Sequence, residues 1–335
     1  MSPRPIAAAV LLLCAFYAPS CGVAQSSPVP NSSPPKPAVE QSGEAPPANG
    51  LNRAGRDGSG LTAGRYLDES RTRLNALESL SARLKQTAEI DGQRFVGEGR
   101  LLIARGGRVR MELTPVADRL GGGPALLQVC DGSILHTQYS LGDSLAVTRR
   151  NVRTVRTEAE ERETGVRLAG DLACGGLAAT LASLRTSMSW EEPIKQRIGE
   201  RPYVVLTGRW TPGAQAVFAE KRKERLDTVG RPGPRPPTGV TVFLEAATLM
   251  PHRIRYWTQE ADGPRIPTLT LDLANVTLNA PFSSEAFEFE LPDGVEVTDL
   301  TEPAVVRARA AGAPKPVKPS ENDGGNPTDS GATNR

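Results

Sequence analysis

The strongest constraint on this chain is an alternation of side chains with a period of two, which recurs in short segments between turn residues. It is clearest in residues 93–104, where apolar side chains share one face with Gly97 and Gly99, and it resumes after Gly106-Gly107. We therefore predict a β-hairpin, in which the two glycines mark strong curvature or the close approach of another segment. The apolar face of this hairpin consists of Phe95, Leu101, Ile103, Met111 and Leu113.

The same alternation predicts most of the remaining chain to be strands. Asp131-Gly132-Ser133 has the composition of a second hairpin turn, and Gly199-Glu200 that of another. A change of parity near Ala274 predicts a β-bulge. The predicted strands cover residues 126–130, 134–139, 146–155, 194–210 in two parts, 240–244, 252–258, 268–278 and 287–291.

Three segments have helical spacing instead. Leucines spaced for a helix predict an amphipathic helix over residues 65–85, and a second over residues 172–184 with Asp171 as its N-cap. A basic helix is predicted for residues 214–227, followed by a Pro-rich connector. Together these elements predict a mainly antiparallel β fold with a few helices, in one domain.

Composition divides the chain into four parts. Residues 25–64 and 303–335 are rich in Pro, Gly and polar residues and lack apolar periodicity, so we expect a disordered spacer and a disordered tail around a domain at residues 65–302. The formal net charge is only +2, which gives no reason to expect nucleic acid as a partner.

Residues 1–24 have the features of a secretory signal peptide. One positive charge, Arg4, precedes an apolar run too short to span a bilayer, and Gly22-Val23-Ala24 offers small residues for cleavage. The alternative is a lipid anchor on Cys21, because residues 18–21 loosely match a lipobox. Both interpretations predict an exported protein of the periplasm or cell envelope, and the lipid anchor would also associate it with a membrane. We expect a monomer.

Two cysteines remain outside this signal, Cys130 and Cys174. In an oxidising compartment they are candidates for a disulfide that would fix the second helix to the sheet, although two buried thiols are the alternative. With only His136 and His252 in the chain, no compact set of ligands predicts a metal site, and no cofactor is expected.

Residues 142–145 spell the Gly-Asp-Ser-Leu signature of a class of lipases and esterases. A nucleophilic Ser144 would need a His base, and the Asp-x-x-His companion of that class is missing here. We therefore interpret the tetrapeptide as a turn and expect no enzyme, with an esterase kept as a remote alternative.

The order of these features resembles the outer-membrane lipoprotein carrier family (LolA/LolB-like). The resemblance covers about residues 65–302 and rests on the initial helix, the run of antiparallel strands, the hairpin at Val129-Cys-Asp-Gly132 and the phrase from Asn279 to Val297, in which Phe-x-Phe precedes Pro and Gly. The long spacer, the basic helix with its connector and the cysteine pair depart from the minimal carrier, which puts direct lipoprotein shuttling in doubt.

The resemblance implies a curved, unclosed β-barrel (half-barrel) with a helical lid over an apolar concavity that shelters acyl chains. The helices at residues 65–85 and 171–185 would form the lid, and the apolar face of the first hairpin would line the cavity. The implied partner is a lipid or an acylated lipoprotein. The alternative is an envelope sensor or protein-interaction module, in which the same face is an ordinary filled core.

Overall fold

The computed structural model describes seven stretches of the chain, namely residues 61–90, 93–116, 126–141, 144–161, 172–229, 236–260 and 263–311. The predicted signal peptide, Cys21, Asp171 and the Gly-Asp of the lipase-like tetrapeptide lie outside the described residues, as does nearly all of the spacer.

Thirteen strands form one sheet, in which every pairing is antiparallel except that of β13 with β6. Along the sheet the order is β13-β6-β5-β4-β3-β2-β1-β12-β11-β10-β9-β7, and β8 also pairs with β9. Among the described strands β13 and β7 do not meet, so the sheet is open. The predicted class, a mainly antiparallel, unclosed sheet with helices, is confirmed. The strands are β1 Ser79–Ile90, β2 Gln93–Ala104, β3 Arg108–Pro115, β4 Leu126–Asp131, β5 Ile134–Leu141, β6 Ser144–Asn151, β7 Met188–Trp190, β8 Ile194–Ile198, β9 Arg201–Trp210, β10 Gly239–Glu245, β11 Pro251–Thr258, β12 Ile266–Leu278 and β13 Val297–Asp299.

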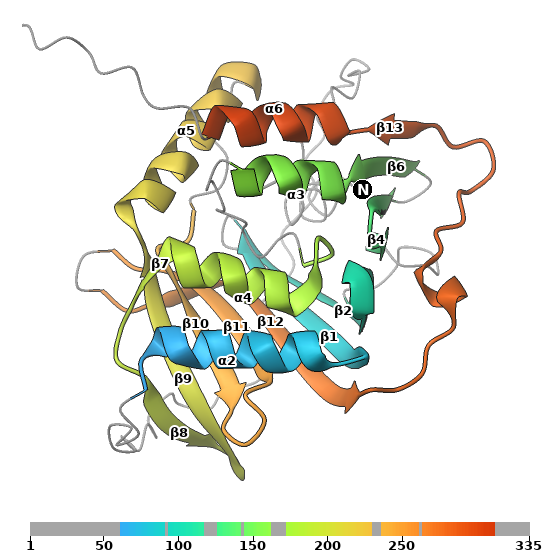
Figure 1. The fold of residues 1–335 in the computed structure, drawn as a ribbon. Helices are drawn as coiled ribbons and strands as arrows, with labels where there is room; N and C mark the ends of the chain where they lie inside the picture. Colours follow the sequence, from blue (N-terminus) through green and yellow to red (C-terminus); the bar gives the residue numbers. More distant parts are fainter. Residues whose placement is uncertain are drawn as a thin grey trace, which may run out of the picture.

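Helices cover one face of this sheet and one end of it. Helices α2 and α4 lie next to each other across the sheet, α3 and α6 pack together near β6, and α5 follows β9 (Figure 1). The α-helices are α2 Ala63–Ala76, α3 Val152–Glu161, α4 Gly176–Ser187, α5 Pro212–Val229 and α6 Thr301–Ala311, with short 3-10 segments η1 Arg105–Gly107 and η3 Ser284–Phe287.

The face beneath α2 and α4, here called the inner face, contains the core. Alternate residues of the central strands point there, because the register pairs Leu84 with Gly99 and Leu101 with Met111. Leu67 from α2 and Leu177 from α4 pack into the same cluster. Burial of these side chains, each worth about 1.5 to 3 kcal/mol, is what holds the helices on the sheet.

The opposite face, here called the outer face, is partly covered by residues 281–296. Phe287 is buried there beneath the Arg108 guanidinium, which lies 5.2 Å from the ring centroid. Phe289 stacks on His136 with ring centroids 4.7 Å apart. The strand predicted for residues 287–291 is wrong. Aromatic contacts hold this segment on the sheet in place of backbone hydrogen bonds to a neighbouring strand.

The first predicted helix was wrong beyond Ala76. The chain becomes extended at Leu77, and β1 begins at Ser79, where it pairs with both β2 and β12. Leu80 and Leu84 fit one face of a strand, with Ala82 between them, as well as they fit one face of a helix. Pairing with the neighbouring strands therefore decides that this segment is a strand. The bulge near Ala274 is confirmed by a register shift between β1 and β12.

Two further boundaries differ from the sequence prediction. Strand β6 ends at Asn151, and residues 152–155 begin helix α3. In its first turn Thr154 N donates a hydrogen bond to the Asn151 side-chain oxygen at 3.0 Å. Helix α6 continues to Ala311, past residue 302, where the composition suggested that the domain would end.

No helix in the described part of the chain has the length and apolar character needed to cross a membrane.

Candidate functional site

Helix α2 is capped at its N-terminus and is bonded to the sheet through its second half. Thr62 caps its N-terminus by accepting a hydrogen bond from Arg65 N at 3.4 Å. The buried Ser70 hydroxyl donates to Leu249 O at 2.7 Å, and Arg73 donates to Ala247 O at 3.0 Å. These bonds join α2 to the turn between β10 and β11, so its other long edge is available to α4.

Helix α4 begins directly above the β2–β3 hairpin. Gly175 and Gly176 have φ values of 105° and 71°, a left-handed conformation that favours glycine. A Cβ at Gly176 would come within 3.1 Å of Ile103 Cδ1, so a residue without a side chain lets the helix start this close to the sheet. The turn thus sets the width of the space between α4 and the end of the hairpin.

A cleft of about 360 Å³ opens at this point, between α2, α4 and the η1 turn. This volume is near the lower end of the range of about 300 to 1,000 Å³ typical of small-molecule sites. We call it the helix cleft. Its apolar wall consists of Leu74, Leu77, Leu80, Ile103, Leu177, Ala178, Ala179 and Ala182.

Only part of this wall is buried by the protein itself. Leu80 and Leu177 form a fully buried floor, whereas Leu74, Leu77 and Ile103 are half-buried. Half-buried aliphatic side chains around a concave space gain from any apolar group that covers them, at about 25 cal/mol per Å² removed from water. The helix cleft is therefore suited to aliphatic ligands.

Two arginines and an amide line the same cleft. Arg71 pairs with Asp68 at 3.4 Å, and Arg105 pairs with Glu78 at 2.9 Å. The Arg71 Nε is buried and has no hydrogen-bond acceptor among the described residues. Together with Asn75, these groups can hold the polar head of a ligand whose apolar part lies in the cleft.

The five predicted cavity residues lie in different surroundings. Leu101, Met111 and Leu113 are only 0%, 5% and 6% exposed and belong to the packed core beneath the helices. Ile103 lines the helix cleft, and Phe95 lies half-buried farther along β2. The structure therefore brings one of the five to the cleft.

Sequence reasoning missed several residues of this cleft. Arg71, Arg105 and Ala182 come from three segments that no local spacing connects. The one available signal was the group of small residues Ala178, Ala179 and Ala182 beside the leucine stripe of α4. Small side chains on a helix permit close approach of a neighbour or leave room for a ligand.

The two cysteines lie in and beside the same core. Cys130 is completely buried in β4, and Cys174 is half-buried just before α4 and packs against the core cluster. The disulfide between them stays a prediction.

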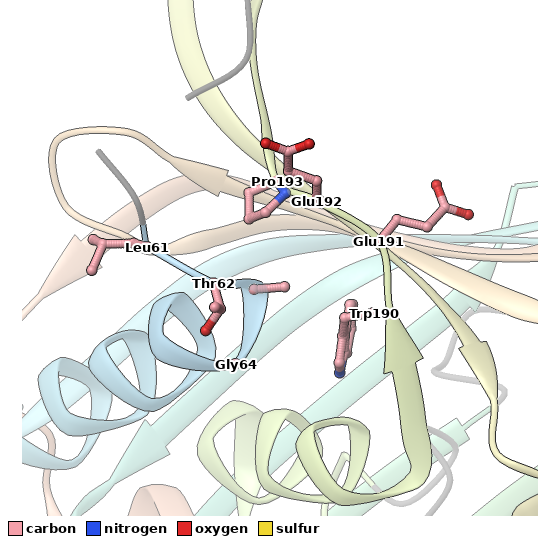
Figure 2. A pocket seen from close by; sticks show the side chains of 8 residues that line it. Leu61, Thr62, Gly64, Trp190, Glu191, Glu192 and Pro193 are labelled. Carbon is pink, nitrogen blue, oxygen red and sulfur yellow. The ribbon is translucent and has the colours of Figure 1, made fainter. Parts of the chain in front are cut away.

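A second hollow of about 370 Å³ lies at the start of α2. Leu61, Thr62 and Gly64 line it from the helix side, and Trp190 lines it from the end of β7 (Figure 2). Two acidic residues follow Trp190, and the carboxylate of one, Glu191, pairs with Arg265 at 2.7 Å. This hollow has a smaller aliphatic wall than the helix cleft, so we place the candidate site in the cleft.

Ser144 has no histidine beside it. It is exposed at the start of β6 and, through its pairing with Leu141, belongs to the inner face, whereas His136 points to the outer face and stacks on Phe289. His252 lies on β11 with Nε2 3.9 Å from Glu245. The geometry therefore forms no Ser-His pair.

The described residues also contain no group of three or more His, Cys, Asp or Glu placed to hold a metal ion.

Comparisons with known proteins give weak similarities to solved structures. No family model and no curated protein matches the sequence. The lipoprotein LppX of Mycobacterium tuberculosis is similar at 11% identity and a TM-score of 0.35, over 66% of this chain and 97% of that one. A LolA superfamily protein of Nitrosomonas europaea is similar at 13% identity and a TM-score of 0.30, over 68% of this chain and 98% of that one.

The MucA/MucB complex of Pseudomonas aeruginosa is also similar, at 12% identity and a TM-score of 0.31, over 68% of this chain and 60% of the matched chain. These similarities include the superfamily that the sequence resembles. All three TM-scores are below 0.5, so these similarities say nothing about the function of this chain.

Proposed function

We propose that this protein is a non-enzymatic carrier of the cell envelope that shelters an acyl chain of a lipid or lipoprotein in the helix cleft. The observation that carries the proposal is the combination of an aliphatic wall with half-buried leucines and a polar rim of Arg71, Asn75 and Arg105. An acyl chain needs apolar area without hydrogen bonds, and its polar head needs donors at one end only.

Burial of each methylene is worth about 0.8 kcal/mol, so even part of a chain in the cleft gives reversible binding. A longer segment would require α2 and α4 to move apart, because Leu181 and Leu184 fill the space beneath them. The two helices therefore act as the lid that the sequence predicted, with the Arg185–Asp68 pair between them at 3.3 Å. An exported protein with a long spacer before its domain would meet its ligand at a membrane surface.

The second candidate function is a protein-interaction module without a ligand. It is favoured by the packing of Leu101, Met111 and Leu113 into a filled core, which leaves the middle of the inner face closed. The two functions differ in one respect that can be measured: only the carrier depends on empty space in the helix cleft.

A cleft-filling variant tests the carrier. Ala182→Phe places a ring in the helix cleft, whereas Ala216→Phe makes the same change at an exposed position of α5. We expect the affinity for a fluorescent fatty acid such as cis-parinaric acid to fall at least about tenfold in Ala182→Phe, since about 1.4 kcal/mol of lost burial suffices. Equal binding by Ala182→Phe, Ala216→Phe and the unaltered protein would exclude the cleft, and absence of binding in all three would favour the interaction module.

A further inference from the structure

The outer face of β8 to β11 contains two arginines of β11 that lie near one buried aromatic ring, that of Phe243. In the register of the sheet, Ile194 pairs with Val205, Val205 with Phe243, and Phe243 with Arg253. Arg253 and Arg255 each lie 5.8 Å from the centroid of the Phe243 ring. This face points away from α2 and α4, which cover the inner face (Figure 1).

The two arginines differ in their partners. Arg253 pairs with Asp272, its neighbour on β12. Arg255 lies opposite Thr241 on one side and Thr270 on the other, and its Nε is buried without a hydrogen-bond partner among the described residues. Burial, and then the positive charge of Arg253, keep the pKa of Arg255 below its usual range, against the opposing effect of Asp272.

A half-buried guanidinium without an acceptor is costly, because water solvates it only in part. A carboxylate can satisfy it with two parallel hydrogen bonds, which is the geometry that arginine favours. The nearest carboxylate on the neighbouring strands, that of Asp272, already pairs with Arg253. The acceptor that suits Arg255 must therefore come from outside these strands.

Apolar side chains beside this arginine point to a polypeptide instead of a simple anion. Ile194 and Ile198 of β8 are 44% and 41% exposed, although both are large aliphatic residues. Ile194 belongs to the same row as Phe243 and Arg253, so apolar and cationic groups follow one another across the strands. Arginine and aromatic side chains next to aliphatic ones are the composition of binding hot spots.

A third arginine extends the positive charge of the face. Arg209 lies over the Trp257 ring at 5.1 Å and donates to the neutral side chain of Gln259. Its charge is thus not matched by a carboxylate in that contact. Positive charge at both Arg209 and Arg255 favours a partner with several carboxylates.

We propose that the outer face of β8 to β11 is a docking surface for an extended acidic segment of a protein partner, with a partner carboxylate on Arg255 and partner apolar side chains against the exposed Ile194 and Ile198. This surface is on the opposite side of the sheet from the helix cleft and does not depend on the carrier function. A carrier or an interaction module with this surface could engage a partner protein while the inner face is covered.

The test uses a fluorescein-labelled synthetic peptide of alternating Glu and Val, about ten residues long, which is enough to cross four strands about 4.8 Å apart. Binding is measured by fluorescence anisotropy with the purified chain. We expect Arg255→Gln to raise the Kd at least about tenfold, because a charge-assisted bidentate contact is lost. The matched control is Arg83→Gln, which removes a cation that already pairs with Glu98 at 2.7 Å and should change the Kd by less than about twofold.

A second variant and three other probes complete the test. Ile194→Ser changes an exposed side chain outside the core and should also lower the affinity for the peptide. The same peptide with Gln in place of Glu should bind at least about tenfold more weakly. Equal loss in Arg255→Gln and Arg83→Gln, equal binding of the Gln peptide, or binding only to phosphatidylglycerol vesicles or inorganic phosphate would overturn the proposal.

Discussion

Arg185 of α4 lies directly against Gly64 of α2. A Cβ at residue 64 would come within 2.9 Å of the Arg185 guanidinium carbon, and the same guanidinium pairs with Asp68 at 3.3 Å. The missing side chain of Gly64 therefore makes room for the Arg185–Asp68 ion pair, which joins the two helices that cover the inner face. This contact would have to break if α2 and α4 move apart, as the proposed carrier function requires.

Gly64→Ala should displace Arg185 and abolish its coupling to α2. Because the obstacle is the flexible end of a side chain and alanine favours a helix, we expect the free energy of unfolding to change by less than about 1 kcal/mol. In the Gly64→Ala background, Asp68→Ala should have a smaller effect than in the unaltered protein. A double-mutant cycle by urea denaturation checks this, and identical effects of Asp68→Ala in both backgrounds would contradict it.

Gly99 and Gly97 offer a matched pair of tests on one strand. A Cβ at Gly99 would come 1.8 Å from the backbone carbonyl oxygen of Glu112, whereas the nearest atom to a Cβ at Gly97 is 3.7 Å away. Gly99→Ala must therefore push β2 and β3 apart, and we expect it to lower the free energy of unfolding by at least about 2 kcal/mol. Gly97→Ala should change it by less than about 1 kcal/mol. Similar losses in both variants, measured by chemical denaturation, would contradict the close approach.

The pairing of Cys130 with Cys174 is tested by mass spectrometry without reductant. If the disulfide forms in the exported protein, neither thiol reacts with iodoacetamide after unfolding, and reduction lowers the free energy of unfolding by about 2 to 4 kcal/mol. The Cys130→Ser/Cys174→Ser double variant gives the matched reference, since reductant should not affect it. Alkylation of both residues in unreduced protein would show that they remain thiols.

Turn chemistry made the hairpins predictable from the sequence. The turn between β4 and β5 forms because the Asp131 carboxylate accepts hydrogen bonds from Ser133 N and Ile134 N, each at 2.7 Å. Gly106 and Gly107 adopt positive φ values of 79° and 77° between β2 and β3. Such signals are local, and they lie within the residues that make the turn.

Strand β1 and the helix cleft could not be predicted in this way. The leucines of β1 fit either a helix or a strand, and the choice depends on pairing with β12, about two hundred residues farther along the chain. The cleft joins Arg71, Arg105 and Ala182 from separate elements, and its empty volume depends on how α2 and α4 pack. Alternation identified the aliphatic residues of the first hairpin as a buried face, but it does not tell a core from a hollow. Their assignment to a cavity was implied by the family resemblance, with a filled core as the alternative.

We expect the stability of the outer face around His136, which stacks on Phe289, to depend on pH. The rings are 4.7 Å apart at an angle of 8°. Burial lowers the pKa of His136 below its usual value; Asp131 at the end of β4 opposes this shift, and Arg149 on β6 adds to it. Neutral His136 is thus favoured in the folded protein, so its contribution to stability is complete above the unfolded pKa of about 6.5 and is lost as the pH falls through the folded pKa.

His136→Gln should remove this dependence. We expect the free energy of unfolding of the unaltered protein to fall more steeply than that of His136→Gln as the pH drops from about 7.5 to about 5, and NMR titration should give His136 a pKa below about 6.5. His252→Gln is the control, because His252 lies on β11, far from this segment in the sheet order. Parallel pH profiles for the unaltered protein and His136→Gln, or a His136 pKa above about 6.5, would show that Phe289 and its neighbours do not favour the neutral ring.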